Sequence, residues 1–131
     1  MASIFTRIIE EEIPCYKVAE SETCFAFLDI NPLAKGHTLV VPKTEVDYLF
    51  DVDETLYLDL MSFAKKVALA VERSVPCKRI GVTVIGLEVP HAHVHLIPIN
   101  SLNDMNFSKP KLSMGKDELE ILAATIASNF N

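Results

Sequence analysis

The longest regular pattern in the chain is a run of hydrophobic residues spaced three or four positions apart. Its apolar positions are Leu56, Leu60, Phe63, Val67 and Val71. This spacing places them on one face of an amphipathic α-helix. Asp53 can cap the first turn of such a helix, and Pro76 cannot continue it. The pattern therefore predicts a long helix over residues 53–75.

Two shorter stretches, one near each end of the chain, also have helical spacing. Ser3 can cap a helix that runs from Ile4 to about Glu11, and Pro14 marks its exit. Further along, the segment GKDELEILAATIASNF predicts a C-terminal helix that begins near Lys116.

Short apolar runs bounded by polar residues, Pro or Gly predict the strands. They cover residues 15–20, 23–29, 37–42, 79–85 and 91–99. The first two are separated only by a polar dipeptide, which favours a hairpin, and the last two follow each other closely, which favours antiparallel pairing. A loop with Pro and Gly precedes the third strand. The order of elements predicts a single α+β domain over residues 1–131, in which an antiparallel sheet packs with the long helix and the C-terminal helix.

Composition and charge exclude several classes of protein. The chain has 131 residues, 50% of them hydrophobic, and a mean hydropathy of +0.26, so it can bury a core. Its net charge of −6 and its lack of Lys or Arg runs disfavour a nucleic-acid partner. No stretch approaches the ~20 apolar residues of a membrane span, and three cysteines without a CxxC pair suit a reducing compartment. We therefore expect a soluble cytoplasmic protein without nucleic-acid or membrane partners.

The residues best suited to catalysis or ligand binding lie in the segment PHAHVHLIP, residues 90–98. In an extended strand, His91, His93 and His95 project from one side, and the aliphatic residues between them project from the other. Two residues of strand span roughly 6.6 Å, so neighbouring rings can converge on one small anion or one metal ion. Packing alone does not account for them, because buried imidazoles require partners for their ring nitrogens. The pattern therefore favours a functional site.

The segment HAHVHLIP resembles the histidine triad signature, in which three histidines alternate with hydrophobic residues. The similarity extends to IFTRIIEEEIP, which resembles the N-terminal helix of that family, and to CFAFLDINPLAKGHTLVVPK, which resembles its ribose-binding strand, loop and following strand. Roughly residues 3–99 are covered. The resemblance is to the Hint-like branch, whose members act on purine nucleoside phosphoramidates and related nucleotidyl compounds. It implies a HIT-like fold and a purine nucleotide substrate.

The resemblance also implies a catalytic role for each histidine. His93, the middle residue of the triad, would attack the α-phosphorus and form a covalent nucleotidyl-histidine intermediate. The main-chain carbonyl of His91 would accept a hydrogen bond from the other ring nitrogen of His93 and so fix its tautomer. His95 would stabilise the developing charge or protonate the leaving group, and His37 would complete the polar wall of the site.

A second group of residues would hold the nucleoside. By resemblance, Asp29 would accept hydrogen bonds from the ribose hydroxyls, and Ile4, Phe5, Ile8 and Phe27 would form an apolar clamp for the base. Each has a structural alternative, because the hydrophobic residues are also suited to the core and Asp29 is also suited to capping the turn that follows it. The resemblance implies no cofactor.

The chain departs from the family pattern at two places. Some relatives bind zinc through a CxxC pair in the N-terminal helix, but the matching positions here are Ser3 and Thr6, so we expect no zinc of that kind. Just before the triad, Glu88 occupies a position where the family carries a hydroxyl residue, and a carboxylate there would repel an anion. Thr83 is the available substitute for an Asn that the family carries upstream.

These observations leave three functions open. The first is a hydrolase or transferase that acts on nucleoside phosphoramidates, with dinucleoside polyphosphates as alternative substrates. The second is a metalloenzyme in which His91, His93 and His95 bind a divalent ion. The third is a nucleotide-binding module with little catalysis. Because family members commonly pair and the helix over residues 53–75 offers a large apolar face, we also expect a homodimer.

Overall fold

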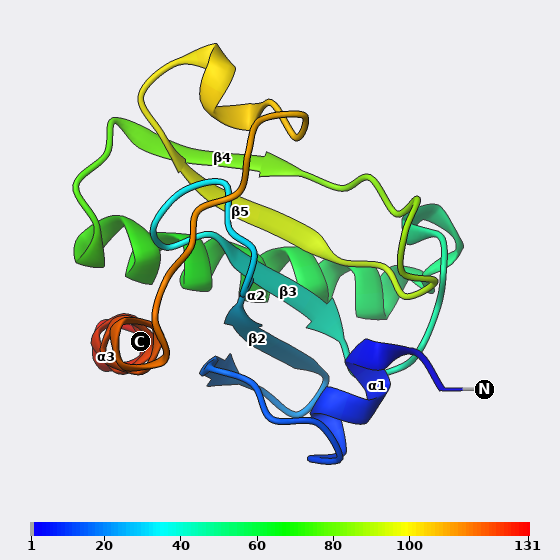
Figure 1. Ribbon diagram of the computed structural model, residues 1–131. Helices are drawn as coiled ribbons and strands as arrows, with labels where there is room; N and C mark the ends of the chain where they lie inside the picture. Colours follow the sequence, from blue (N-terminus) through cyan, green and yellow to red (C-terminus); the bar gives the residue numbers. More distant parts are fainter. Residues whose placement is uncertain (1) are drawn as a thin grey trace.

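The computed structural model describes residues 2–131 and has an α+β architecture built on a five-stranded sheet (Figure 1). The strands lie in the order β1-β2-β3-β5-β4, and all neighbouring strands are antiparallel. They are β1 (Lys17–Glu20), β2 (Cys24–Leu28), β3 (Thr38–Pro42), β4 (Arg79–Thr83) and β5 (Val94–Ile99). The helices are α1 (Ile4–Ile9), α2 (Glu54–Ser74) and α3 (Lys116–Ser128), with short 3-10 turns η1 (Leu49–Asp51) and η2 (Leu102–Met105). The predicted fold class is confirmed.

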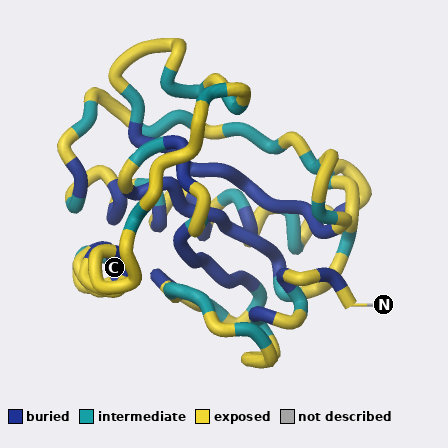
Figure 2. Tube along the Cα trace, viewed as in Figure 1, coloured by how far each residue is buried: buried dark blue, intermediate teal, exposed yellow. Residues whose placement is uncertain are grey.

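The two faces of the sheet carry different sets of side chains, because successive residues of a strand point to opposite sides. The face toward α2 and α3 forms the main core and includes Cys24, Ala26, Leu28, Val40, Val94 and Leu96. The opposite face packs against α1 and includes Phe25, Phe27, Leu39 and Val41. Figure 2 shows that the central strands are buried along most of their length. The alternation seen in the sequence therefore separates a structural face from a face available for a site.

The long helix is close to the prediction, and the N-terminal helix is shorter than predicted. α2 begins after Asp53, whose carboxylate accepts a hydrogen bond from Leu56 N–H, as expected for an N-cap. α1 ends at Ile9 rather than near Glu11, and Glu11 itself adopts a left-handed conformation with φ of 64°. Three consecutive acidic residues follow the helix, and negative charge at a helix C-terminus opposes the helix dipole. This charge explains the early end of α1.

The histidine segment is only partly a strand, which corrects the prediction of a strand over residues 91–99. β5 begins at Val94, so His91 and His93 precede it. Pro90 has no N–H to donate, His91 N–H closes a turn onto the carbonyl of Val89, and Ala92 N–H bonds to the distant Val46 carbonyl instead of a neighbouring strand. The sheet ladder is therefore established only after the second histidine. The strand that pairs with β5, β4, ends at Thr83 rather than at the predicted residue 85.

A segment that the sequence predicted only as a polar loop crosses the face of the sheet opposite α2 (Figure 1). This crossover segment, residues 100–115, connects β5 to α3. It is tied to the loop before β3 by a hydrogen bond of 2.8 Å from Leu112 N–H to the carbonyl of Pro32. Its Phe107 ring lies 5.0 Å from the ring of His95. The crossover segment therefore forms part of the surroundings of the histidines.

Within the described residues, none of the helices combines the length and the hydrophobicity that crossing a membrane would require.

Candidate active site

A pocket on the α1 face of the sheet collects most of the residues predicted to form the site. Its walls come from α1, the end of β2 and the loop after it, and the segment that leads into β5. Among its lining residues are Ile4, Phe5, Ile8, Phe27, Asp29, Glu88, His93 and His95. His91 and His37 do not line the pocket, and both are almost completely buried. The predicted residues thus divide into a group that faces the pocket and a pair that supports it from behind.

His93 is held in one orientation by the chain immediately before it. Its Nδ1 atom lies 2.8 Å from the main-chain oxygen of His91. A carbonyl oxygen can only accept a hydrogen bond, so Nδ1 of His93 carries the proton. In the neutral ring, Nε2 then has a free lone pair. The edge-on ring of Phe5, 4.9 Å away, packs against the imidazole and restricts its rotation.

His91 is turned away from the pocket, so the three rings of the triad do not converge on one ion as the simple strand geometry predicted. Both of its ring nitrogens have partners: Nε2 lies 2.7 Å from the carbonyl oxygen of Pro42, and Nδ1 lies 2.8 Å from Oγ of Ser3. Burial lowers the pKa of His91, which favours the neutral ring. The side chain of His91 therefore has a structural role, and its main-chain oxygen contacts His93.

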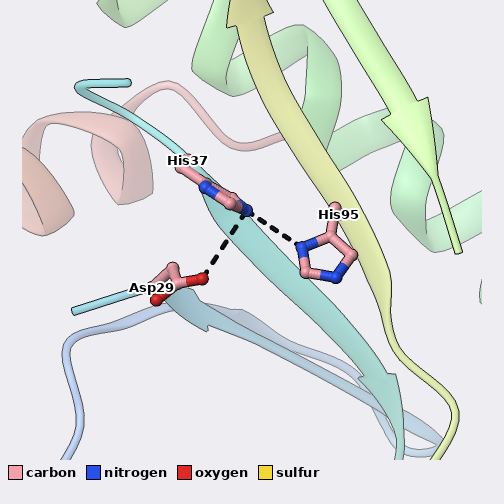
Figure 3. A group of neighbouring side chains, drawn as sticks. All are labelled: Asp29, His37 and His95. Atoms are coloured by element: carbon pink, nitrogen blue, oxygen red, sulfur yellow. Dashed lines mark hydrogen bonds and ion pairs between the residues drawn. The ribbon is translucent and has the colours of Figure 1, made fainter. Parts of the chain in front are cut away.

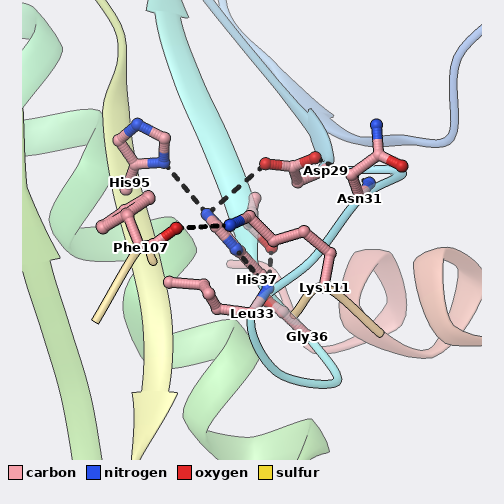
Figure 4. A network of polar contacts seen from close by, with 9 residues as sticks. Asp29, Asn31, Leu33, Gly36, His37, His95, Phe107 and Lys111 are labelled. Atoms are coloured by element: carbon pink, nitrogen blue, oxygen red, sulfur yellow. Dashed lines mark hydrogen bonds and ion pairs between the residues drawn. The ribbon is translucent and has the colours of Figure 1, made fainter. Parts of the chain in front are cut away.

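His95 and His37 form a hydrogen-bonded pair whose protonation is set by the backbone (Figures 3 and 4). The amide of Leu33 donates to Nδ1 of His37 at 3.0 Å, so the proton of neutral His37 is on Nε2. That Nε2–H lies 3.0 Å from Nδ1 of His95 and donates to it. The proton of neutral His95 must therefore be on Nε2. The pocket thus contains one imidazole with a free lone pair and another with an N–H group.

Burial keeps this histidine pair neutral. Desolvation, followed by the neighbouring His95, lowers the pKa of His37 to about 3. Desolvation, followed by His93, lowers the pKa of His95 to about 4. Phe107 contributes to this burial, because its ring packs edge-on against both imidazoles. At neutral pH each ring is therefore uncharged, and the tautomers derived from the hydrogen bonds apply.

Asp29 caps the turn after β2 and also lines the pocket. Its Oδ1 accepts a hydrogen bond of 2.8 Å from Asn31 N–H and so caps the turn after β2. Its Oδ2 lies 3.6 Å from Nε2 of His37, too far for a hydrogen bond, and the residue lines the pocket. Burial is the main cause of a raised pKa for this carboxyl group. One oxygen of Asp29 is therefore structural, and the other remains available to a ligand.

The residues that could hold a metal ion are not the three histidines of the metalloenzyme alternative. Among residues 2–131, Asp29, His37 and His95 have donor atoms that all lie within 4.8 Å of one another (Figure 3). A metal bound to Nε2 of His37 would leave the ring proton on Nδ1, but Nδ1 already accepts a hydrogen bond from the amide of Leu33. To keep that hydrogen bond and bind the metal, the ring would have to lose both of its protons. This donor set therefore does not suit a divalent ion, and the triad histidines do not form a metal site.

Two residues of the crossover segment were missed by the sequence interpretation. Phe107 packs against the paired histidines, and Lys111 donates a hydrogen bond of 2.6 Å to the main-chain oxygen of Phe107 (Figure 4). Burial is the main cause of the raised pKa of Asp29 and of the lowered pKa of His37, and the positive charge of Lys111 opposes the first shift and adds to the second. A lone aromatic residue within a polar stretch was the only available signal, and nothing in the sequence connected it to the histidines.

Glu88 and Thr83, which depart from the family pattern just before the triad, lie at the edge of the site. Glu88 is exposed and lines the pocket, and its charge contributes to the raised pKa of Asp29. Thr83 ends β4 directly opposite His95 in the strand pairing. Glu88 is therefore placed to meet a ligand in the pocket, whereas Thr83 is a neighbour of His95 in the sheet.

An antiparallel sheet that presents such a histidine pair beside an apolar pocket defines the class of histidine triad proteins. The sequence model of the HIT domain family matches residues 10–102 of this chain, so the chain belongs to the HIT family. Residues 103–131, which include most of the crossover segment and all of α3, lie beyond that match.

Similar proteins occur in distant organisms. An adenosine 5'-monophosphoramidase of Schizosaccharomyces pombe is 32% identical over 133 residues, which cover 99% of each chain. One from Saccharomyces cerevisiae is 39% identical over 98 residues, which cover 74% of this chain and 62% of the yeast protein.

The solved structures extend the likeness to the whole fold. A Hit-like protein from Bartonella henselae has a TM-score of 0.85 and 30% identity, and the match covers 98% of this chain and 96% of that one. A zinc-bound histidine triad protein from Mycobacterium smegmatis shares the fold, with a TM-score of 0.80 and 24% identity over 98% of this chain and 93% of that one.

Proposed function

We propose that the protein is a nucleotidyl hydrolase or transferase that acts on purine nucleoside phosphoramidates through a covalent intermediate on His93. The observation that carries this proposal is the pair of fixed tautomers at the pocket. The free lone pair on Nε2 of His93 can attack phosphorus, while Nε2–H of His95 can donate a hydrogen bond to the phosphoryl group. Both tautomers are set by main-chain groups, so they are present before a substrate binds.

The proposed reaction has two steps. In the first, Nε2 of His93 bonds to the α-phosphorus, the P–N bond breaks, and the leaving nitrogen keeps the electron pair and takes a proton from solvent. In the second, water attacks the phosphorus and releases a proton to solvent, the bond between phosphorus and Nε2 of His93 breaks with its electron pair returning to Nε2, and the nucleoside monophosphate leaves. The hydrogen bond from Nδ1–H of His93 to the main-chain oxygen of His91 stabilises the positive charge on the nucleotidylated ring.

The geometry favours the first of the two roles considered for His95, stabilisation of charge. A doubly protonated His95 would point Nδ1–H at Nε2–H of His37, whose proton is fixed by the amide of Leu33. Protonation would therefore break the hydrogen bond of 3.0 Å between the two rings. We infer that His95 acts as a neutral donor that stabilises negative charge on the phosphoryl group, rather than as a general acid.

The substrate class follows from the rest of the pocket and from the relatives. The apolar wall formed by Ile4, Phe5, Ile8 and Phe27 suits a flat base, and the free oxygen of Asp29 suits the ribose hydroxyls. Two relatives are named as adenosine 5'-monophosphoramidases. Glu88 at the pocket edge disfavours leaving groups that carry phosphate charge. Dinucleoside polyphosphates are therefore proposed as poorer substrates than phosphoramidates.

Two further expectations belong to this proposal. We expect a homodimer, since β4 is an edge strand whose Val82 is 53% exposed, and hydrophobic residues near its end are exposed as well. The expectation from the sequence rested on α2, but α2 uses its apolar face within its own domain. We also expect a reducing, cytoplasmic location, because Cys15, Cys24 and Cys77 are free thiols.

A substrate panel tests the proposal. Purified protein would be incubated with adenosine phosphoramidate, with diadenosine polyphosphate and with buffer, and nucleotide products would be separated by chromatography. We expect faster release of adenosine monophosphate from the phosphoramidate, and its loss by several orders of magnitude in His93→Ala, which retains nucleotide binding. Faster turnover of the polyphosphate would select the alternative substrate class. Binding without turnover of either compound would identify a nucleotide-binding module instead.

A further inference from the structure

A second polar cluster lies behind the pocket, on the far side of His91 from His93. It consists of Ser3, Thr6, Glu45 and the ring of His91. Nδ1 of His91 lies 2.8 Å from Oγ of Ser3 and 3.4 Å from Oγ1 of Thr6. One carboxylate oxygen of Glu45 lies 2.7 Å from Ser3 N and 2.6 Å from Oγ1 of Thr6. We call these four residues the Ser3 cluster; it joins α1 to the connection between β3 and α2.

The hydrogen bonds of the Ser3 cluster have only one consistent direction for neutral His91. Nε2 of His91 must donate to the carbonyl of Pro42, so Nδ1 is an acceptor and receives the hydroxyl proton of Ser3. Oγ of Ser3 in turn accepts from Thr6 N–H, which is the N-cap bond of α1. The amide of Ser3 and the hydroxyl of Thr6 both donate to Glu45. Every donor therefore has an acceptor.

The cluster does not fit the zinc ion that the family resemblance associates with the positions of Ser3 and Thr6. Zinc in proteins prefers thiolate, imidazole and carboxylate ligands, and two neutral hydroxyls do not replace two thiolates. In addition, the lone pair of His91 Nδ1 already accepts a hydrogen bond from the hydroxyl of Ser3. Hydrogen bonds occupy the positions that ligand bonds would need.

We propose that the Ser3 cluster is a metal-free positioning device for the nucleophile. It holds the ring of His91, whose main-chain oxygen is the partner of His93 Nδ1. Because His91 is 0% exposed and is bonded at both ring nitrogens, its peptide group has little freedom to turn. Ser3, Thr6 and Glu45 are thus positioning residues for the proposed reaction, and this inference rests on the proposed role of His93.

The simpler alternative is that Ser3 only caps α1. The two roles can be separated, because Glu45 belongs to another element and has no part in the N-cap bond to Thr6. The variants would be Ser3→Ala and Glu45→Ala, with Ser3→Thr as the conservative variant that keeps the hydroxyl. Asp53→Ala is the matched control, since it removes the N-cap of α2 without touching His91.

Two readouts would be taken from each variant: steady-state turnover of adenosine phosphoramidate and the tautomers of His91 and His93 from ¹⁵N NMR of the ring nitrogens. We expect Ser3→Ala and Glu45→Ala to lower kcat by about tenfold to a hundredfold with KM changed little, because misorientation of a reacting group affects the chemical step. We expect mixed tautomers at His93 in Ser3→Ala, because the main-chain oxygen of His91 is no longer held in place, whereas the carbonyl of Pro42 still fixes the tautomer of His91. Ser3→Thr should restore a single tautomer and turnover, and Asp53→Ala should show neither defect.

The outcomes also separate this inference from the proposed function. A single wild-type tautomer at His93 in both Ser3→Ala and Glu45→Ala would overturn the positioning role, whatever the activity. An equal loss of kcat in Asp53→Ala would overturn it as well, because the effect would then be general destabilisation. If the wild type turns over no nucleotide but the tautomers change as expected, the proposed function fails and the structural part of the inference stands.

Discussion

At the scale of single residues, the site is defined by the positions of a few protons on imidazole rings. The main-chain oxygen of His91 and the main-chain amide of Leu33 fix opposite tautomers at His93 and His95. In the proposed reaction one ring is the nucleophile and the other a hydrogen-bond donor, although both are histidines in similar surroundings. Sequence resemblance predicted the identity of these residues, but the division of roles depends on backbone groups that no side-chain motif encodes.

A neutral donor role for His95 predicts a particular order among its variants. His95→Gln keeps a neutral N–H group near the phosphoryl position, whereas His95→Ala removes it. We expect His95→Ala to lose about 10²–10³-fold in kcat/KM, and His95→Gln to retain at least about tenfold more activity than His95→Ala. Losses should be similar for phosphoramidates with good and poor leaving amines. A loss that grows with the basicity of the leaving amine would instead identify His95 as a general acid.

The buried histidine pair also predicts a dependence of stability on pH. The folded-state pKa values of His37 and His95, about 3 and about 4, lie below the unfolded value of about 6.5, so the unfolded state binds more protons between these limits. Stability from this source is complete above about pH 6.5 and is lost as the pH falls toward 4. We expect the free energy of unfolding to decrease by about 1–2 kcal/mol per histidine between pH 7 and pH 5.

Denaturant unfolding at the two pH values would measure this decrease, with His37→Gln as the comparison. The variant should show a smaller decrease than the wild type, because one of the two buried titrating rings is gone. Equal stability of the wild type at pH 7 and pH 5 would contradict the burial of neutral imidazoles.

At the scale of elements, local patterns predicted more than long-range contacts did. The long helix was placed within one residue at each end because its cap and its Pro stop lie in the adjacent sequence. The start of β5 was placed incorrectly because it depends on a hydrogen bond from Ala92 to Val46, far along the chain. The contact of Phe107 with the histidines was missed for the same reason. Local signals fix the elements, whereas the surroundings of the site come from segments that meet only in the folded chain.

The crossover segment predicts a measurable effect on the titration of the site. Phe107→Ala would expose His95 and His37 to water and raise their pKa values toward the ordinary range, since burial is the main cause of the lowered values. We expect an NMR titration of the His95 ring to move to higher pH by about one unit. Phe107→Leu is the control, because it keeps an apolar side chain over the rings. The same titration of His95 in Phe107→Ala as in the wild type would show that the segment does not shield the histidines.

At the scale of the whole molecule, one region of the surface is more hydrophobic than a monomer requires. β4 is unpaired along one edge, and Tyr48, Phe50 and Leu87 beside its end are 58%, 69% and 88% exposed. An exposed edge strand next to apolar side chains is suited to pairing with a second copy. The site lies on the face covered by α1, so this association would leave the pocket open.

Light scattering tests the expected association. We expect a mass near twice 14.6 kDa for the wild type and near the monomer value for a variant that combines Val82→Glu with Leu87→Glu. Ile121 on α3 is 68% exposed and lies away from β4, so Ile121→Glu is the matched control and should remain dimeric. A monomeric wild type at micromolar concentration would refute the dimer.

The proposed reaction requires that His93 become covalently nucleotidylated. Rapid acid-free quenching of a reaction with adenosine phosphoramidate, followed by intact-mass measurement and peptide mapping, would detect this intermediate. We expect a transient mass increase of one adenylyl group, located on His93, that is absent from His93→Ala and accumulates at substrate saturation. Turnover without any adduct under these conditions, or an adduct located on another residue, would contradict the assignment of His93 as the nucleophile.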